Sequence, residues 1–420
     1  MGEIMLLQFS VENFQCLKNK TTLNMLAANL AEYKDSLIDN NVLPIASIYG
    51  PNGGGKTTLL KAFYTMQSLI AKPFNYLGGI QLNEHQTVIG MPIIPFKFDS
   101  ATLNKPTNFE IFLKLNSIEY KYSISTFQNK IVSESLYAKN LHVKNARVKL
   151  IFNRENNNVE LSLELKKNIK INNISDGMPC LVWIGLLYDV KPIKEIINWF
   201  LNTFSVDYNI PLQDEILLGN IYQIDSIDNQ KNVNLKNKLV YTLKNMDLNI
   251  VNYKVDKKEI FPNRFKYNII TTHKVNDNDY NLTLNEESNG TKKIFALLPL
   301  FLVALEEART IIVDELDAKL HPMLLKYIIE LFNNKNTNPK GAQLIFTSHD
   351  LTTMTKELFR RDEIWFMALN NNEYSKLYSL VEIRNEEGNM VRPDASYNKQ
   401  YLEGRYGADP YLQKILSWES

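Results

Sequence analysis

The chain has few of the features that mark a secreted or metal-binding protein. Its 420 residues include only two cysteines, Cys16 and Cys180, which lie far apart and in no metal-ligand spacing. We interpret both as core thiols in a reducing compartment, which excludes a disulfide framework and a cysteine-based metal site. The opening run MGEIMLLQFSVENF carries charges among its apolar residues and has no small-residue cleavage site, so we expect no signal peptide.

The sequence also lacks a net charge of either sign, a long apolar run and a repeat. Its 47 basic and 46 acidic residues nearly cancel, so binding to nucleic acid would need a local basic patch. The longest apolar run, near residues 295–305, is too short to span a bilayer. No heptad run is long enough for a coiled coil. We therefore expect a cytoplasmic protein without a membrane partner.

What the sequence does contain is enough apolar residues for two or three packed domains. An apolar segment at 4–11 and alternating segments between 91 and 165, including 91–99 and 159–165, predict an antiparallel β subdomain. Amphipathic stretches past residue 165 predict a helical lobe with returning strands, and helix and strand patterns then alternate to the end of the chain. The expected divisions are 1–164, 165–285 and 286–420.

A glycine-rich turn between an apolar strand and an apolar-faced helix carries the clearest chemistry. The run GPNGGGKT at 50–57 matches G-x-x-x-x-G-K-[ST], the phosphate loop of nucleoside triphosphate-binding proteins. Its glycines let backbone N–H groups surround phosphate oxygens, its lysine contacts the β- and γ-phosphates, and Thr57 offers a hydroxyl to Mg²⁺. A plain glycine-rich turn is the weaker alternative. The candidate nucleotide-binding residues are Gly50, Pro51, Asn52, Gly53, Gly54, Gly55, Lys56, Thr57 and Thr58, with Lys56 also counted as catalytic.

A second motif, RTIIVDELDAKLHP, places carboxylates at the end of an apolar strand. We expect Asp314 in the Mg²⁺ shell, and Glu315, which has no ligand duty, as the general base for the attacking water. A further strand, GAQLIFT, ends in Ser-His-Asp. The ends of parallel strands meet at one edge of a sheet, so we expect His349 near Glu315 and in contact with the γ-phosphate. A solvated acidic turn is the alternative that the phosphate loop disfavours.

The run NEESNGTKKIFALLPLFLVAL predicts a second anion site. Ser288 and Gly290 precede a very apolar helix, and a hydroxyl, a glycine and a free helix N-terminus together favour a phosphate. We expect Lys292 and Lys293 to add positive charge. Within one subunit this site should be distant from the phosphate loop, so it makes sense only against another subunit's nucleotide. A plain N-cap at Ser288 is the alternative.

The order of these motifs resembles that of ABC-type ATPases: phosphate loop, long insertion, Ser-x-Gly helix, VDE, and histidine after another strand. The opening FSVENFQCLKNKTTL resembles the first strands of the SMC/RecF branch, and DELDAKLHP resembles the Walker B and D-loop run of OLD-like ATPases. The run YNKQYLEGRYGADPYL resembles the tail of the RloA/AbiLi ATPases of bacterial abortive-infection operons. These resemblances imply an α/β fold, a P-loop NTPase of the ABC-ATPase head type, with a mixed sheet, an antiparallel β subdomain and an inserted helical lobe.

The same resemblance implies an ATPase that forms a homodimer, or a higher homo-oligomer, around ATP and Mg²⁺. Each phosphate loop would face the partner's Ser-x-Gly helix, and Asp317 would cross the seam between subunits. Only 71 residues follow His349, too few for the Toprim nuclease that many OLD-like proteins carry. We therefore expect a separate effector, a nuclease of RloB/AbiLii type, and a role in anti-phage defence.

The sequence departs from the family pattern in two places. It has no clean Q-loop, for which Gln86 is the nearest candidate, and its signature reads Glu-Ser-Asn-Gly without the usual leucine before the serine. A RecF/SMC-like ATPase that binds DNA in repair or genome maintenance is the alternative. Its candidate phosphate-contacting stretches are 139–149 and 163–170, although charged hairpins are typically solvated. The ATPase subunit of a membrane transporter is disfavoured by the opening and the tail.

The C-terminal run 401–411 is richer in aromatic residues than a free tail would be. We interpret it as a segment that packs on its own fold. The alternative is that Arg405 and Tyr406 anchor the effector, because arginine and aromatic residues often dominate interfaces.

Overall fold

The structure, a computed structural model, describes residues 4–72, 93–171, 174–206, 230–246, 250–261, 264–370, 372–385 and 387–408. Packing divides the chain into two compact units. The first unit comprises Met1–Thr203 and Met354–Ser420, and the second comprises Phe204–Thr353. The expected divisions after residues 164 and 285 rest on changes in the sequence pattern, whereas these two units are defined by the contacts that residues make with one another. No helix in the described ranges is long and apolar enough to cross a membrane.

The first unit contains a seven-stranded antiparallel sheet with the order β2-β1-β4-β5-β6-β7-β8. Buried and accessible residues alternate along β4, as expected where one face of a sheet covers a core. Asn116 and Asn129 take left-handed conformations in the hairpin turns, which asparagine tolerates. The expected antiparallel β subdomain is therefore confirmed. The strands are β1 (Ile4–Glu12), β2 (Thr21–Asn24), β4 (Thr107–Leu115), β5 (Ile118–Phe127), β6 (Lys130–Asn140), β7 (Lys149–Glu155) and β8 (Asn158–Leu161).

The strand expected at 91–99 is wrong for residues 93–99, which form none. Pro95 has no N–H to donate to a neighbouring strand. The backbone there bonds instead to the turn after β1, where Phe96 N donates to Asn13 Oδ1 over 3.0 Å. The apolar alternation of this segment therefore reflects burial of single side chains and not a place in the sheet.

One helix of the first unit, α4, takes the place of the second half of the strand expected at 159–165. β8 ends at Leu161, and the Ser162 hydroxyl accepts a hydrogen bond from Leu165 N, which caps the next helix. Pro192 lies in the first turn of α6, as expected for a residue without an N–H. The helices are α1 (Lys56–Ala71), α3 (Ser100–Leu103), α4 (Leu163–Lys166), α5 (Cys180–Leu187), α6 (Lys191–Asn202) and α11 (Tyr397–Leu402), with 3₁₀ turns η1 (Lys34–Ser36), η4 (Arg361–Glu363) and η5 (Leu380–Glu382).

Helix α1, which follows the phosphate loop, is anchored by α6. The Phe63 ring packs edge-on against Trp199 with 6.0 Å between centroids. Gln67 Nε2 donates to Phe200 O and Thr203 O over 2.8 and 2.6 Å. These bonds satisfy carbonyls at the end of α6 that have no partner within the helix. The helix behind the phosphate loop is thus fixed by an apolar contact and a polar one.

Three further strands of the first unit lie around the phosphate loop. β3 (Ile45–Tyr49) runs parallel to β15 (Ile364–Leu369), and β15 pairs antiparallel with β16 (Ser375–Ser379). Every residue of β3 is buried, which is typical of a strand covered on both faces. The apolar strand expected before the loop is therefore present.

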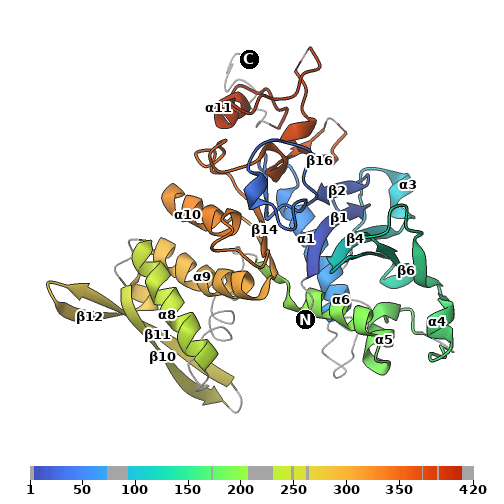
Figure 1. Ribbon diagram of the computed structural model, residues 1–420, viewed down its shortest axis with the longest axis horizontal. Helices are drawn as coiled ribbons and strands as arrows, with labels where there is room; N and C mark the ends of the chain where they lie inside the picture. Colours follow the sequence, from blue (N-terminus) through green and yellow to red (C-terminus); the bar gives the residue numbers. More distant parts are fainter. Residues whose placement is uncertain are drawn as a thin grey trace, which may run out of the picture. The chain divides into compact units, whose positions relative to one another are not determined.

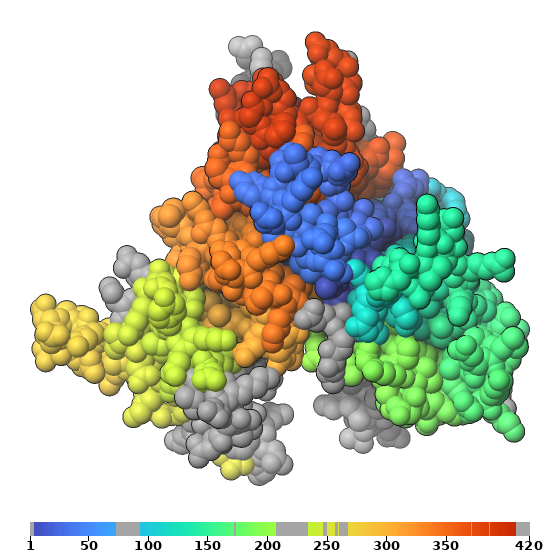
Figure 2. Space-filling model, viewed as in Figure 1, coloured from blue at the N-terminus to red at the C-terminus, as the bar shows by residue number. Residues whose placement is uncertain are grey.

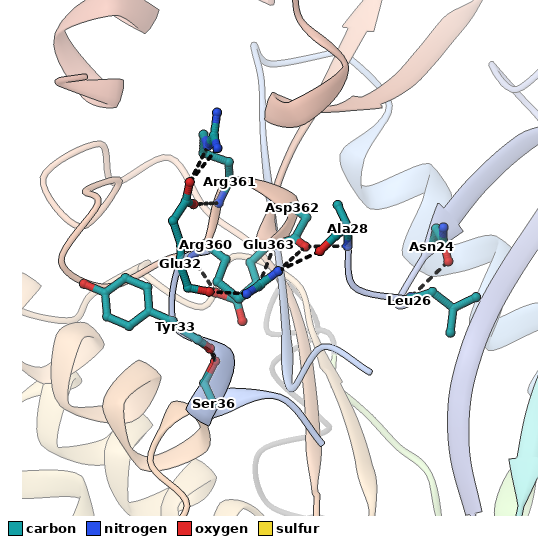
Figure 3. Close-up of polar contacts among 10 residues, drawn as sticks. All are labelled: Asn24, Leu26, Ala28, Glu32, Tyr33, Ser36, Arg360, Arg361, Asp362 and Glu363. Carbon is teal, nitrogen blue, oxygen red and sulfur yellow. Dashed lines mark hydrogen bonds and ion pairs between the residues drawn. The ribbon is translucent and has the colours of Figure 1, made fainter. Parts of the chain in front are cut away.

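A buried polar cluster closes the start of β15 (Figure 3). The fully buried Arg360 donates to both carboxylate oxygens of Asp362, over 2.9 and 2.7 Å, and to the carbonyl oxygens of Ala28 and Glu32. Burial raises the pKa of the neighbouring Glu363 carboxyl to about 8. Losing one member of a buried pair leaves an uncompensated charge. The cluster therefore ties the segment near Ala28 firmly to the start of β15.

The described part of the C-terminal tail packs on the first unit. Tyr401 and Tyr406 are 5% and 4% exposed, and their rings lie 5.6 and 5.2 Å from the Phe366 ring of β15, centroid to centroid. Arg405, by contrast, is exposed. The burial of Tyr406 fits the interpretation that the tail completes its own fold and leaves this side chain unavailable to an effector. Tyr411 lies outside the described residues.

The second unit combines a parallel sheet with a three-stranded antiparallel one. β13 lies between β9 and β14, parallel to both, and the antiparallel order is β10-β11-β12. Figure 1 shows α8 lying across this second sheet, where it contacts β10 and α9 through an apolar face that includes Leu235, Leu239 and Leu243. The elements are β9 (Phe204–Val206), α8 (Gln230–Asn245), β10 (Ile250–Phe261), β11 (Arg264–Val275), β12 (Asn278–Thr283), η3 (Leu284–Glu286), α9 (Asn289–Glu307), β13 (Thr310–Val313), α10 (Pro322–Asn333) and β14 (Gln343–Thr347).

Candidate nucleotide-binding and hydrolysis site

The phosphate loop of the first unit connects β3 to α1. Gly50 has a φ of 145°, and a Cβ atom there would lie 2.1 Å from Met367 O of β15. Gly55, directly before α1, has a φ of 102°, and its Cβ would lie 2.5 Å from Ser375 Oγ of β16. Only glycine satisfies both the backbone conformation and the close packing. The loop therefore rests directly on β15 and β16.

Lys56 opens α1 and turns its side chain back into the loop. Its Nζ donates to Gly50 O over 2.8 Å and to Pro51 O over 3.1 Å, and the residue is 6% exposed. Phosphate oxygens would offer this ammonium stronger, charge-assisted hydrogen bonds than two neutral carbonyls do. Thr57 beside it is half-buried, and Asn52 is exposed at the tip of the loop. The loop thus presents the donor set that a triphosphate requires.

The turn after β1 is a neighbour of the phosphate loop that the sequence did not reveal. Thr58 Oγ1 donates to Gln15 Oε1 over 3.5 Å, and Gln15 has a φ of 49°. Cys16 is half-buried, not a core thiol as expected, and its Sγ lies 3.0 Å from where a Cβ of Gly55 would sit. The sequence marked this run only as a turn. Gln86, the nearest Q-loop candidate, lies outside the described residues.

In the second unit, Asp314 follows the buried strand β13 and is 3% exposed. Its Oδ1 accepts a hydrogen bond from Thr347 Oγ1 over 2.5 Å, and that hydroxyl accepts one from Glu315 N over 2.7 Å. Asp314 Oδ2 is buried and has no hydrogen-bond partner in the described ranges. A buried, unpaired carboxylate oxygen is a suitable ligand for a hard divalent cation.

The donor set suits Mg²⁺ better than a metal caged by protein side chains. No group of three or more histidine, cysteine, aspartate or glutamate residues in the described part of the chain could hold a metal ion alone. Mg²⁺ in nucleotide sites takes one or two protein ligands and completes its shell with phosphate and water. The buried, unpaired Oδ2 of Asp314 is such a ligand.

Glu315 and His349 lie at the ends of neighbouring strands. β13 and β14 are paired in parallel, so the expected adjacency of their ends is present. Glu315 has a φ of 49°, a conformation that costs a residue with a Cβ atom on the order of 1 kcal/mol and is common at functional sites. The exposed His349 donates its backbone N–H to Asp317 Oδ2 over 3.0 Å. Asp317 thereby joins the turn after β13 to the histidine.

The N-terminus of α9 lies against the same turn. The Ser288 hydroxyl accepts a hydrogen bond from Thr291 N over 3.0 Å, so this residue does act as an N-cap. A Cβ atom at Gly290 would lie 3.0 Å from Lys319 O. Glycine therefore permits the close approach of α9 to the turn. Capping and anion binding are compatible roles, because Ser288 is exposed.

The two lysines of this helix differ from the expectation that they add charge to an anion site. Lys293 is buried, and its Nζ donates to Glu315 O and Ala318 O over 2.7 and 2.8 Å. Lys292 Nζ donates to Asn285 O over 2.8 Å. Both ammonium groups thus bond to backbone carbonyls. Lys293 fixes the turn after β13 to α9, which spacing in the sequence could not show.

Two solved structures resemble this chain at low sequence identity. One is described as "Crystal structure of the SmcHead bound to the C-winged helix domain of ScpA", with 12% identity over 89% of this chain and 97% of that chain and a TM-score of 0.44. The other is described as "Dimeric structure of a post-hydrolysis state of the ATP-binding cassette MJ0796 bound to ADP and Pi", with 12% identity, coverage of 90% and 98%, and a TM-score of 0.31. No curated protein matches the chain.

A protein-family model provides the assignment. The strand–loop–helix around Lys56, the parallel strands and the antiparallel sheets confirm the expected α/β fold with the phosphate loop of a P-loop NTPase. The family model described as "AAA domain, putative AbiEii toxin, Type IV TA system" matches residues 45–178 and 205–355, more than half of the chain. The matched ranges include every candidate site residue. The chain therefore belongs to this family of AAA domain proteins.

Proposed function

We propose that this chain is an ATPase that dimerises around ATP and thereby regulates a separate effector in anti-phage defence. The observation that carries the proposal is the pairing of two elements in the second unit. Lys293 bridges the N-terminus of α9 to the turn that holds Asp317. A subunit that binds a partner's nucleotide with a helix N-terminus and crosses the seam with an aspartate needs both elements fixed together.

Each candidate residue then has a role that its surroundings support. Bound Mg²⁺ would neutralise phosphate charge, held by Thr57 and by Asp314 with its unpaired oxygen. Lys56 would offset the charge of the β- and γ-phosphates, and Glu315 would accept the proton of the attacking water. The exposed His349 would contact the γ-phosphate. ATP would shift the population towards the dimer, and hydrolysis would release it.

The defence role and the partner are the more specific part of the proposal. The family description names a toxin of a type IV TA system, and we extend that description to this chain as support. The narrower assignment to the RloA/AbiLi ATPases, with a RloB/AbiLii-type nuclease as effector, rests on the resemblance of the C-terminal run. We propose a homodimer as the smallest active assembly, with a higher homo-oligomer built from it.

We expect the Ser288→Arg substitution to block the ATP-bound dimer, because arginine would fill the space in front of the helix N-terminus. Binding of ATP by the single chain should be unchanged, since the phosphate loop belongs to the first unit. Sedimentation of the Glu315→Gln chain with and without ATP measures the dimer. Ser162→Arg, at the N-cap of α4, is the matched control. Equal dimerisation of the Ser288→Arg and parent chains would remove the ATP sandwich from consideration.

A DNA-binding ATPase remains the second candidate, and one surface favours it. A groove between α8 and β10 is lined by Lys236, Tyr241 and Lys244, together with Asn237 and Asn252. None of the described residues that line it is acidic, and Tyr241 is 67% exposed. Figure 2 shows α8, in yellow-green, at the surface of the second unit. Lysines that contact phosphates and an exposed ring that stacks on bases are typical of single-strand binding.

The combined Tyr241→Ala and Lys244→Glu substitutions test this second candidate. If the groove binds single-stranded DNA, the two substitutions should weaken binding about tenfold or more. They should also reduce the slope of the logarithm of the binding constant against the logarithm of the salt concentration by roughly one. Titration of a labelled single strand at several salt concentrations gives both values. Lys335→Glu, at an exposed position just after α10 and outside both the groove and the stretches 139–149 and 163–170, is the control. A parent chain that binds no DNA at low salt would eliminate this candidate.

A further inference from the structure

Glu287, which takes the place of the usual leucine before the signature serine, makes contacts of its own. Its side chain is 7% exposed, although the residue lies next to the exposed Ser288. Its Oε1 accepts a hydrogen bond from Thr271 Oγ1 over 2.5 Å and lies 2.6 Å from His273 Nε2. Thr271 and His273 are two positions apart on β11, so both side chains lie on the same face of that strand.

The segment between β12 and α9 is held by consecutive side-chain bonds. Thr283 N donates to Glu286 Oε2 over 2.7 Å, which completes a capping box around η3. The next residue, Glu287, bonds to β11, and Ser288 then caps α9. The direction in which α9 leaves the sheet is therefore fixed from β11. The close approach of Gly290 to the turn after β13 depends on that direction.

The charge of Glu287 also affects whether the N-terminus of α9 can bind a phosphate. A carboxylate one residue before a phosphate-binding helix N-terminus would repel the phosphate unless its charge were directed elsewhere and stabilised there. The bonds with Thr271 and His273 direct the carboxylate towards β11 and supply it with hydrogen-bond partners. Leaving a buried carboxylate without these hydrogen-bond partners would cost its desolvation and free its charge beside the helix N-terminus.

We propose that Thr271, His273 and Glu287 are positioning residues, which hold the N-terminus of α9 in the geometry needed to receive the phosphates of a partner's ATP. The inference rests on the proposed dimerisation around ATP. It also makes the three-stranded sheet part of the dimerisation machinery, since the sheet sets the position of the signature helix. The unusual glutamate is then an anchor that replaces an apolar contact with a polar one.

Thr271→Val and Thr272→Val form a matched pair for the test. The two threonines are neighbours on β11 but face opposite sides, and Thr272 Oγ1 donates to Asn281 Oδ1 on β12 over 2.9 Å. In the Glu315→Gln chain, Thr271→Val should weaken ATP-dependent dimerisation about tenfold or more, because a buried acceptor loses its donor. ATP binding by the single chain should stay unchanged. Thr272→Val should match the parent in both measurements.

Two further measurements separate positioning from loss of folding. Backbone amides of residues 289–293 should exchange hydrogen faster in Thr271→Val than in Thr272→Val, at equal melting temperatures. The loss of ATP-dependent dimerisation in His273→Ala should be largely reversed by adding Glu287→Gln, because glutamine removes the charge and keeps an acceptor. A parent chain that stays monomeric with ATP overturns the proposed function and this inference with it. A parent that dimerises while the two valine variants behave alike, in exchange and in dimerisation, overturns the inference alone.

Discussion

Replacement of Lys56 by alanine should abolish ATP binding, with a loss of affinity of at least about a hundredfold, because charge-assisted bonds to phosphate are among the strongest in proteins. The ammonium group is buried within the loop and bonds to Gly50 O and Pro51 O. Its removal therefore takes away the cation that faces the phosphates and two bonds that shape the loop. Equilibrium titration with a fluorescent ATP analogue measures the affinity.

The control for this result lies on the same helix. Lys61 is exposed on α1, one turn beyond the phosphate loop, so Lys61→Ala should bind ATP with the parental affinity. Lys56→Arg is a second comparison, because it keeps the charge but does not fit the space that a lysine fills. If Lys56→Ala bound ATP as tightly as Lys61→Ala, the assignment of the phosphate loop would be wrong.

Glu315→Gln should leave ATP binding intact and lower hydrolysis by about 10²–10⁴-fold, the usual contribution of a general base. Glutamine has nearly the same shape and can adopt the same backbone conformation, but its amide does not accept the proton of the attacking water. Glu315 has a left-handed backbone conformation, so we infer that the turn, and not side-chain packing, sets the direction of its side chain. Phosphate release at saturating ATP gives the rate.

Glu330→Gln provides the comparison for this substitution. Glu330 lies on α10, where its carboxylate is 54% exposed and makes only a loose ion pair with Lys326 at 3.8 Å. Such pairs contribute little, so this variant should hydrolyse ATP at the parental rate. Parental turnover in Glu315→Gln would refute the general-base assignment, and loss of ATP binding in that variant would point to a role in the fold instead.

The parts of the molecule that the sequence predicted well carry local signals. The turn at 50–57 contains glycines because its backbone takes conformations that glycine adopts readily. In the strands from β4 to β6, buried and accessible residues alternate within a few positions. Residues 93–99 show the limit of such patterns. Their alternation predicts a strand, although Pro95 lacks the N–H donor that a strand would need.

The roles that the sequence did not reveal depend on contacts between distant segments. In the sequence, Lys293 resembles a lysine on the surface of a helix. The structure shows that it donates to carbonyl oxygens of the turn after β13. Gln15 contacts Thr58 because the turn after β1 reaches the phosphate loop. In the sequence, Glu287 is a departure from the usual signature, and only the structure shows its hydrogen-bond partners on β11. No local pattern encodes which carbonyl or hydroxyl a side chain meets.

The support beneath the phosphate loop has a consequence for the order in which the chain acquires its structure. β3 pairs with β15, and Ser47 Oγ donates to Glu363 O across 316 positions of sequence. On the ribosome, the loop at Gly50 emerges long before Met367, the residue on which it rests. The second unit is made in that interval, and its strands β10, β11 and β12 pair with their neighbours in sequence. The support of the nucleotide-binding loop can therefore form only after the segment that carries Glu315 has been made.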